Sequence, residues 1–446
     1  MVGFQNKPQQ QITKSQKTII FGSWLGWSLD GYDLVLMLFI ISSISQLFFP
    51  SKDPTLSLLA IFATYTVTLV MRPVGGALFG SFGDKHGRKK AMIITVSGFS
   101  TATFLTGLLP TWQSVGILAP ILLILLRFAQ GLFAGGEWAS GAVITMETAS
   151  KSMRGFLSGF VQSGYTFGFL IASIVFQMML SAYPGNSFIS GGGWRIIFYT
   201  GIIPGLIALF VGFKMNESEL WLKKVGQKKT EGSPLRKGMG SPLRKIIGGK
   251  EARKRFLLAL IVMTGLMYAY YTTMGFMPTF LQKYLNIETH EAATIMIAAS
   301  ISSLIGTVFA GFISQRIGRM TTLTLFASAA IILAIPTLNG LHDSTTITQR
   351  MFFTALLVFV ASTAFGPIPA FLSERFPTAI RNSASGFVYN GGLIIGSWSP
   401  LIAIQLLSLA HPQFIPYALA INIIIGSIII LIGSRLNPDT RDADLD

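Results

Sequence analysis

Two carboxylates lie three residues apart inside a long apolar segment. The stretch W27-S-L-D-G-Y-D33 belongs to a run from Ile19 to Ile44 that is otherwise almost wholly apolar, so Asp30 and Asp33 fall within one buried helix. Residues three apart share a helix face. Two carboxylates on one face, beside a guanidinium, can exchange a proton for an ion pair. The spacing therefore predicts proton coupling at Asp30 and Asp33; a static salt bridge that fixes helix register is the alternative.

Three more charged residues fall inside apolar segments. At 1.5 Å per residue, Arg72 and Asp30 lie about 18 Å and about 20 Å from the same membrane face, so they are predicted to meet near mid-membrane. Arg127 lies mid-segment, and Glu137 follows ten residues later. Such charges normally face a cavity and have a partner. We expect Arg72 and Arg127 to bind an anionic substrate, unless Arg72 only shapes its helix. We expect Glu137 to serve proton coupling, paired with Arg127 or Arg154.

Uncharged polar side chains in the apolar segments are candidates for a substrate cavity. The stretch Y268-A-Y-Y-T-T-M-G-F-M-P278 places three tyrosines in one span, and its glycine and proline permit bending. Ordinary helix packing is the alternative for each of them. The segments after residue 255 carry no acid or base away from their ends, so coupling chemistry is predicted in the first half of the chain. The predicted substrate contacts, besides the two arginines, are Gln130, Gln162, Tyr165, Tyr268, Tyr271 and Asn390.

Membrane-spanning helices must position these residues. Of the 446 residues, 51% are hydrophobic and only 12% are charged, against about 25% charged in soluble proteins. A span needs about 20 apolar residues. We predict an all-α integral membrane protein with about twelve spans, at 18–46, 57–82, 91–110, 115–146, 155–182, 194–214, 256–282, 291–314, 320–340, 348–373, 382–409 and 414–435.

Basic residues gather on one side of the predicted membrane. Alternate loops and tails hold 28 of the 34 Lys and Arg, and the opposite loops hold only Lys52, Lys283 and Arg350. This bias places both termini in the cytoplasm, and it accounts for the net charge of +16 without nucleic acid as a partner. The predicted organisation is an N-terminal tail (1–17), a six-helix bundle (18–214), a basic cytoplasmic linker (215–255), a second six-helix bundle (256–435) and a C-terminal tail (436–446). The linker is either a solvated loop or contains helical pieces lying on anionic lipid.

The two halves repeat each other. G80-S-F-G-D-K-H-G-R88 aligns with G311-F-I-S-Q-R-I-G-R319 at an offset of 231, and E147-T-A-S-K-S-M-R-G-F-L-S-G-F-V161 aligns with E374-R-F-P-T-A-I-R-N-S-A-S-G-F-V388 at an offset of 227. Six plus six spans with a same-sense repeat are typical of transporters whose halves are related by an axis along the membrane normal. The binding site is then expected near the midplane, between the halves.

These motifs resemble the major facilitator superfamily over nearly the full chain. G80-x-x-x-D84-K-x-G87-R88 is similar to its signature loop between spans two and three, although Lys85 replaces the usual Arg. R127-F-A-Q-G-L-F-A-G-G-E-W138 resembles metabolite:proton symporters and the related sialate and organic-acid symporters. The resemblance implies a cytoplasmic latch, for example between Asp84 and Arg381, with a merely topogenic basic loop as the alternative. The implied gating residues are Gly80, Asp84, Gly87, Arg88, Glu147, Arg154, Arg319, Glu374 and Arg381.

No constellation for catalysis is visible. The chain has no cysteine, its four histidines lie in predicted loops or at span ends without metal-ligand spacing, and no phosphate-binding G-x-x-x-x-G-K-[ST] loop occurs. We therefore expect no enzyme activity, no metal and no cofactor. The leading hypothesis is a monomeric, multi-pass transporter of the cell membrane that moves a small organic anion together with protons by alternating access. A carrier of neutral sugars or drugs, and a membrane sensor without transport, are the alternatives.

Overall fold

Every regular element of the described chain is a helix. The computed structural model describes residues 13–86, 88–136, 138–214, 249–378 and 380–445. Within them, ten helices are long and apolar enough to cross a membrane, and Leu118–Ala134 and Gly193–Ile207 are shorter apolar helices. A helix satisfies its own backbone hydrogen bonds, which lipid cannot do. Large apolar side chains such as Ile332 and Phe352 are exposed on the surface. The predicted all-α membrane fold is confirmed.

The helices of the first half begin earlier and break more often than the sequence suggests. The first starts at Lys14, four residues before the predicted span, because Thr13 and Gln16 form a capping box. The predicted span 115–146 is divided in two near Gly135. The elements are α1 (Lys14–Phe48), α2 (Pro54–His86), α3 (Arg88–Leu108), α4 (Trp112–Val115), α5 (Leu118–Ala134), α6 (Trp138–Thr148), η1 (Lys151–Met153), α7 (Arg154–Ala182), α8 (Ser187–Ser190), α9 (Gly193–Thr200) and α10 (Ile202–Lys214).

In the second half, helical structure begins at Lys250, so residues 250–255 belong to a helix. Residues 215–248 lie outside the described residues, and the basic linker stays a prediction. The elements are α13 (Lys250–Tyr270), η2 (Tyr271–Gly275), α14 (Met277–Lys283), α15 (Thr289–Ile317), α16 (Arg319–His342), α17 (Ile347–Ser362), η3 (Thr363–Phe365), α18 (Ile368–Arg375), α19 (Arg381–Gly391), α20 (Leu393–Gly396), α21 (Ser399–Leu409), η4 (Pro412–Phe414) and α22 (Ile415–Leu436).

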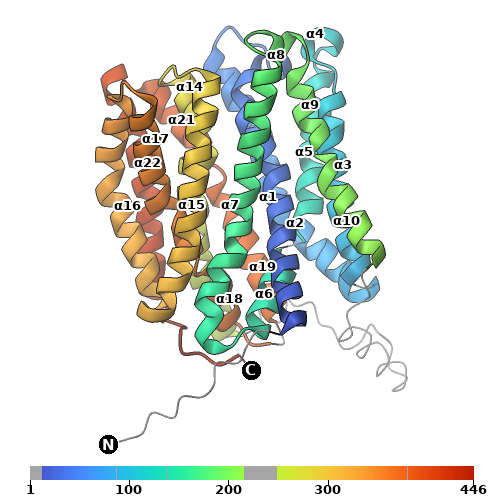
Figure 1. The fold of residues 1–446 in the computed structure, drawn as a ribbon, viewed down its shortest axis with the longest axis vertical. Coiled ribbons are helices and arrows are strands. Elements are labelled where there is room, and N and C mark those ends of the chain that lie inside the picture. The colour runs from blue at the N-terminus through green and yellow to red at the C-terminus, as the bar shows by residue number, and fades with distance from the viewer. Residues whose placement is uncertain (1–12, 87, 137, 215–248, 379, 446) are drawn as a thin grey trace, which may run out of the picture.

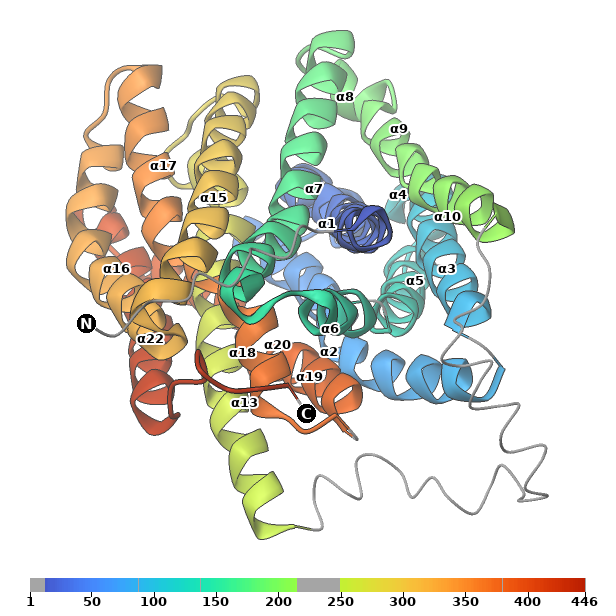
Figure 2. The same ribbon diagram turned by 60° about the horizontal axis from the view of Figure 1, so that its bottom comes forward.

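The long helices run side by side, and the starts of α1 and α13 and the end of α22 lie at one end of the bundle (Figure 1). We call this the tail end and the other the opposite end. Figure 2 looks toward the tail end and shows α1–α10 on one side and α13–α22 on the other, with α7 and α15 neighbouring across the seam. A Cβ added to Gly311 of α15 would overlap the backbone of Gly159 in α7. Small residues thus let the two halves meet closely at the seam.

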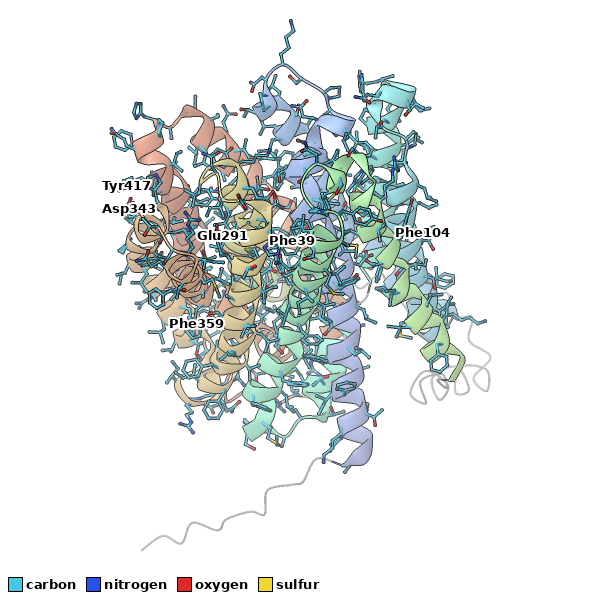
Figure 3. All side chains as sticks on the ribbon, turned by 45° about the horizontal axis from the view of Figure 1, so that its top comes forward. Phe39, Phe104, Glu291, Asp343, Phe359 and Tyr417 are labelled. Atoms are coloured by element: carbon cyan, nitrogen blue, oxygen red, sulfur yellow. The ribbon has the colours of Figure 1, made fainter. Side chains whose placement is uncertain are left out.

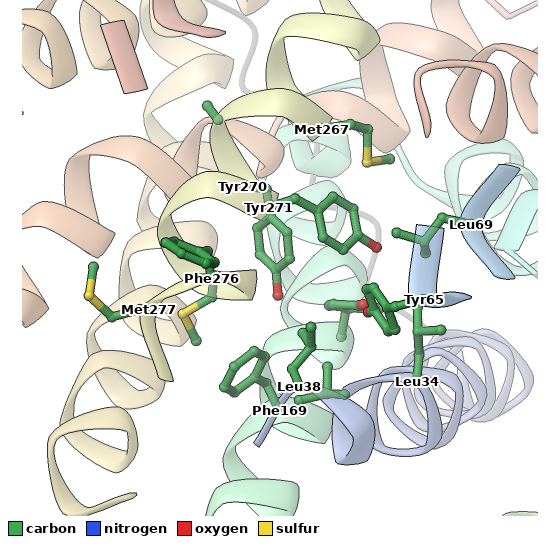
Figure 4. Packing of buried hydrophobic residues seen from close by; sticks show 14 of the residues in the cluster. Leu34, Leu38, Tyr65, Leu69, Phe169, Met267, Tyr270, Tyr271, Phe276 and Met277 are labelled. Carbon is green, nitrogen blue, oxygen red and sulfur yellow. The ribbon is translucent and has the colours of Figure 1, made fainter. Parts of the chain in front are cut away.

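Apolar side chains from both halves fill the centre of the bundle. Figure 4 shows Leu34 of α1, Tyr65 of α2 and Phe169 of α7 near Tyr270 and Tyr271, which stand where α13 passes into η2. All five belong to one buried cluster. η2 is a π-helical turn, and such turns inside α-helices are frequent at functional sites. The π-helical turn therefore marks the region around Tyr271 as a candidate functional site.

Candidate functional site

Arg72 and Asp30 form an ion pair in the interior. Arg72 of α2 donates from Nη2 to Asp30 Oδ2 of α1 at 2.5 Å, and the two side chains are only 3% and 1% exposed. The same nitrogen donates to the Ala134 carbonyl at 3.2 Å, and the guanidinium carbon lies 5.8 Å from the centre of the Trp27 ring. The two residues meet as the depth argument predicts, while their role in coupling stays a prediction.

Gly131 of α5 and Gly135, which directly follows that helix, bring α2 into position for this pair. A Cβ added to Gly131 would overlap the Thr68 carbonyl, and one added to Gly135 would overlap the carbonyl of Arg72. Only small residues permit this approach of two backbones. The close contact explains how the Arg72 side chain reaches both a carbonyl of α5 and a carboxylate of α1.

Asp33 has different neighbours from Asp30. Its Oδ2 accepts hydrogen bonds from Thr103 Oγ1 at 2.9 Å and from Gln130 Nε2 at 2.8 Å. Gln130 Oε1 in turn accepts from Arg127 Nη1 at 2.6 Å, and Arg127 Nη2 donates to Thr106 at 2.9 Å. The carboxylate and the guanidinium are thus linked through the Gln130 amide, without a direct ion pair.

This second network is fully buried and incompletely bonded. Asp33, Arg127 and Gln130 are at most 2% exposed. Asp33 Oδ1 and Arg127 Nε have no hydrogen-bond partner among the described residues. A buried charge costs free energy unless it is paired and hydrogen-bonded. Asp33 is therefore a place where a proton could be gained or lost during a conformational change.

A central cavity lies beside the Arg72–Asp30 pair. The volume in it that is open to water-sized molecules is about 30 Å³, well below the range of about 300–1,000 Å³ for ligand sites, so the cavity is narrow in this conformation. Both halves contribute to its wall, and nearly half of the lining residues are aromatic. The lining residues are Trp27, Arg72, Gln162, Tyr165, Thr166, Met267, Tyr270, Tyr271, Thr307, Ser362, Phe365, Tyr389 and Leu393.

Four predicted substrate contacts line this cavity: Arg72, Gln162, Tyr165 and Tyr271. The other four do not. Arg127 and Gln130 belong to the Asp33 network, and Tyr268 points instead to α22, where its hydroxyl donates to Asn422 Oδ1 at 2.5 Å. Asn390 donates to the carbonyls of Gly135 and Gly386 at 3.2 and 3.0 Å. Glu137 lies outside the described residues.

Contacts between the halves close the cavity toward the tail end. Tyr389 of α19 stacks on Trp138 of α6 with 3.7 Å between ring centres. Gln162 of α7 joins the two, because it donates to the Tyr389 hydroxyl at 3.0 Å and accepts from Trp138 Nε1 at 3.3 Å. Gln162 and Tyr389, which occupy equivalent positions in the two repeats, thus contact each other directly.

The opposite end is also bridged. Ser42 of α1 donates to Gln282 of α14 at 3.1 Å, and Phe62 packs on Phe276 with ring centres 5.7 Å apart. Farther out within the second half, Arg350 donates to Glu291 at 2.6 Å; Figure 3 labels Glu291 at the start of α15. The two halves therefore contact each other toward both ends of the bundle, on either side of the cavity.

Several predicted gating residues form ion pairs at the tail end. Arg381 donates to Glu147 across the two halves at 2.7 Å, and Arg319 pairs with Glu374 within the second half at 3.0 Å. Arg154 donates to the carbonyl of residue 443 at 3.0 Å. Among the described residues, the carboxylate partner of Arg381 is Glu147, and the expected pairing of Arg381 with Asp84 stays a prediction. The surroundings of Gly80, the side chains of Asp84 and Arg88, and the whole of Gly87 lie outside the described part of the chain.

Sequence reasoning missed most of the apolar cavity wall. Trp27, Tyr270 and Phe365 carry no charge and sit in apolar runs, where packing residues look the same. One available signal was that the helices are interrupted beside cavity residues. Tyr271 begins η2, and Phe365 ends η3, two residues before Pro367. Broken helices at membrane depth line cavities in transporters.

Comparisons of the sequence with known proteins agree with this fold. The model of the Major Facilitator Superfamily matches residues 19–400. The chain is 30% identical over 411 residues to the "Glycine betaine/proline/ectoine/pipecolic acid transporter OusA" of Dickeya dadantii, with 90% of this chain and 80% of the relative covered. It is also 30% identical over 421 residues to the "Proline/betaine transporter" of Escherichia coli K12, with 93% and 82% covered.

Solved structures give the same fold. The partially occluded, inward-open xylose transporter XylE of E. coli superimposes with a TM-score of 0.71 at 19% identity, covering 97% of this chain and 100% of that one. Together with the family match, this makes the chain a multi-pass membrane transporter of the secondary type rather than an enzyme. The chain belongs to the major facilitator superfamily.

Proposed function

We propose that this transporter moves a small carboxylate together with protons. The observation that carries the proposal is the position of Arg72, which lines the cavity and is bound to Asp30 at 2.5 Å. A guanidinium offers paired donors that match a carboxylate. A substrate carboxylate entering the cavity competes with Asp30 for Arg72. Protonation of Asp30 releases the arginine without leaving an unpaired buried charge.

Asp33 supplies a second proton-handling group in this proposal. It lies one helical turn from Asp30 and outside the cavity wall, hydrogen-bonded to Gln130 and Thr103. Its network joins α1, α3 and α5, so movement between these helices changes its hydrogen bonds. We assign substrate binding to the Arg72 side of α1 and the conformational response to the Asp33 side.

A zwitterion that carries both a carboxylate and an ammonium group is the second candidate. Six of the cavity residues are aromatic: Trp27, Tyr165, Tyr270, Tyr271, Phe365 and Tyr389. Aromatic faces attract cations, and cages of such rings recognise quaternary ammonium groups. The names of the two relatives include betaine and proline, which are zwitterions of this kind. Arg72 would hold the carboxylate in either case.

The test is transport by the purified protein in liposomes with an imposed pH gradient. The labelled compounds are a simple monocarboxylate, glycine betaine, proline and a neutral sugar. Accumulation of a carboxylate that a protonophore abolishes supports coupling, and preference for glycine betaine over the monocarboxylate selects the second candidate. Accumulation of the sugar alone, or uptake that ignores the pH gradient, overturns the proposal. We further propose that the tail end faces the cytoplasm, on the basis of the Lys and Arg bias.

A further inference from the structure

Residues 437–445 follow α22 and cross the tail end of the bundle. They contain no helix. Figures 1 and 2 show this segment leaving α22 and running toward the centre of the tail end. We call residues 437–445 the C-terminal strap. Its contacts divide into two groups, one on each half of the protein.

The first part of the strap is fixed to the second half. Asp439 Oδ2 accepts from the backbone N–H of Met320, in the first turn of α16, at 3.0 Å. A carboxylate is favoured at a helix N-terminus. Thr440 donates to Glu374 Oε2 at 2.8 Å, and Glu374 is itself paired with a buried arginine of α16. These contacts hold the strap on the half from which it emerges.

The last part of the strap is bound to the first half. The Ala443 carbonyl accepts from Arg154 Nη1 at 3.0 Å. Asp444 accepts from Lys151 Nζ at 2.9 Å, and this hydrogen bond lowers the pKa of the Asp444 carboxyl. Lys151 begins η1, and Arg154 is the first residue of α7, which follows directly. The strap therefore continues from one half to the other across the seam.

Leu445 adds an apolar contact at the same place. It packs against a small buried cluster that is separate from the main core and combines four residues of the first half with one of the second. The members of the cluster are Ile20, Met146, Ala149, Leu157 and Ala370. Residues of both halves are thus covered by the end of the strap.

We propose that the C-terminal strap is a clasp that favours closure of the tail end and releases the first half each time that end opens. When the halves separate there, α7 moves away from α16 and α18. The contacts of residues 443–445 with α7 must then break, whereas those of Asp439 and Thr440 can persist. This role does not depend on which substrate is carried.

A single reactive thiol can report on the clasp. The chain has no cysteine, so Ala370→Cys places one thiol in the buried cluster. The measurement is its rate of alkylation by a bulky, water-soluble maleimide in the purified protein. A variant that ends at Asp442 lacks the contacts with the first half and should react about tenfold faster. Asp442→Asn in the full chain is the matched control, because this exposed carboxylate pairs with the neighbouring Arg441 and not with the first half in the described structure; its rate should stay within about twofold.

A second reporter separates opening from unfolding. Thr279→Cys places a thiol in α14, near the opposite end, where Thr279 is fully buried. Loss of the clasp should leave this thiol equally or less reactive, whereas unfolding exposes both thiols. If the shortened variant does not fold, Lys151→Glu should raise alkylation at position 370 about threefold, and adding Asp444→Lys should restore it. Unchanged alkylation at position 370, or a parallel rise at both reporters, overturns the proposal.

Discussion

The Arg72 guanidinium stands between the carboxylate of Asp30 and the central cavity. Arg72 is part of the cavity wall, and its Nη2 lies 2.5 Å from Asp30 Oδ2. Removing one partner of a buried ion pair leaves an uncompensated charge, which costs about 3–5 kcal/mol. A ligand that takes Arg72 from Asp30 must therefore be accompanied by neutralisation of Asp30. In the proposed mechanism, the arrival of substrate and the arrival of a proton are therefore linked at this one contact.

Asp30→Asn should uncouple transport from the pH gradient. The amide is neutral at any pH and cannot exchange a proton, so we expect accumulation driven by a pH gradient to fall at least tenfold. Exchange of labelled for unlabelled substrate across the liposome membrane should remain, because it needs no net proton movement. The two assays are run on the same preparation.

The control for this variant is Asp53→Asn. Asp53 is exposed between α1 and α2 and accepts a hydrogen bond from the nearby Thr55 N–H, so the same chemical change there should leave both assays unaltered. Driven accumulation that survives in Asp30→Asn would remove Asp30 from the coupling mechanism.

Gln130→Ala should disconnect Asp33 from Arg127. The amide accepts from Arg127 at 2.6 Å and donates to Asp33 at 2.8 Å, so its loss leaves two buried charges less satisfied. We expect the free energy of unfolding to fall by about 1–3 kcal/mol, measured by thermal unfolding in detergent, together with lower transport. Gln113→Ala is the control, because Gln113 is an exposed residue of α4. Equal stability of the two variants would show that Gln130 does not hold the network together.

The membrane fold follows from local features that the sequence displays directly. Apolar runs, the repeat and the Lys and Arg bias each depend on residue type and spacing alone, and the helices formed where these features lie. The meeting of Arg72 with Asp30 could also be predicted, because depth along two adjacent helices is simple arithmetic. The ends of the helices were harder to predict, because Thr13 caps α1 from within a polar tail.

The partners of the embedded residues depend on helix rotation, which spacing does not give. Asp30 and Asp33 share a helix, yet one bonds to α2 and the other to α3 and α5. Tyr268 lies two residues before Tyr270, a turn of about 200° around the helix, and it points to Asn422 and not into the cavity. The aromatic residues that line the cavity carry no charge, so only the helix breaks at η2 and η3 could have pointed to them in the sequence.

Phe365→Leu should distinguish the two substrate candidates. Phe365 lines the cavity and packs edge-on against Tyr270 and Tyr389, with ring centres 5.7 and 6.4 Å away. Leucine keeps an apolar side chain but has no ring to attract a cation. A cation–π contact is worth about 0.5–2 kcal/mol, so binding of glycine betaine should weaken about twofold to thirtyfold. Binding of a simple monocarboxylate should change little. Phe352→Leu, on the exposed surface, is the control, and equal losses for both ligands would argue against an aromatic cage.

Replacing Arg381 should destabilise the protein more than replacing its partner Glu147. Arg381 is buried and donates to the carbonyls of Ser373 and Phe376 at 2.9 and 3.2 Å as well as to Glu147 at 2.7 Å. The Glu147 side chain is 38% exposed, and in Glu147→Gln the buried Arg381 keeps its carbonyl partners and can still donate to the neutral amide oxygen. We expect Glu147→Gln to lower the free energy of unfolding by less than about 1 kcal/mol. Arg381→Gln should lower it by about 1.5–3 kcal/mol, as measured by thermal unfolding in detergent.

The milder Glu147→Gln should still make the tail end open more often, since it weakens only the contact between the halves. Alkylation of the single thiol in the Ala370→Cys background should then rise severalfold. Equal destabilisation by the two substitutions, or no change in alkylation, would mean that the pair does not help to keep that end closed.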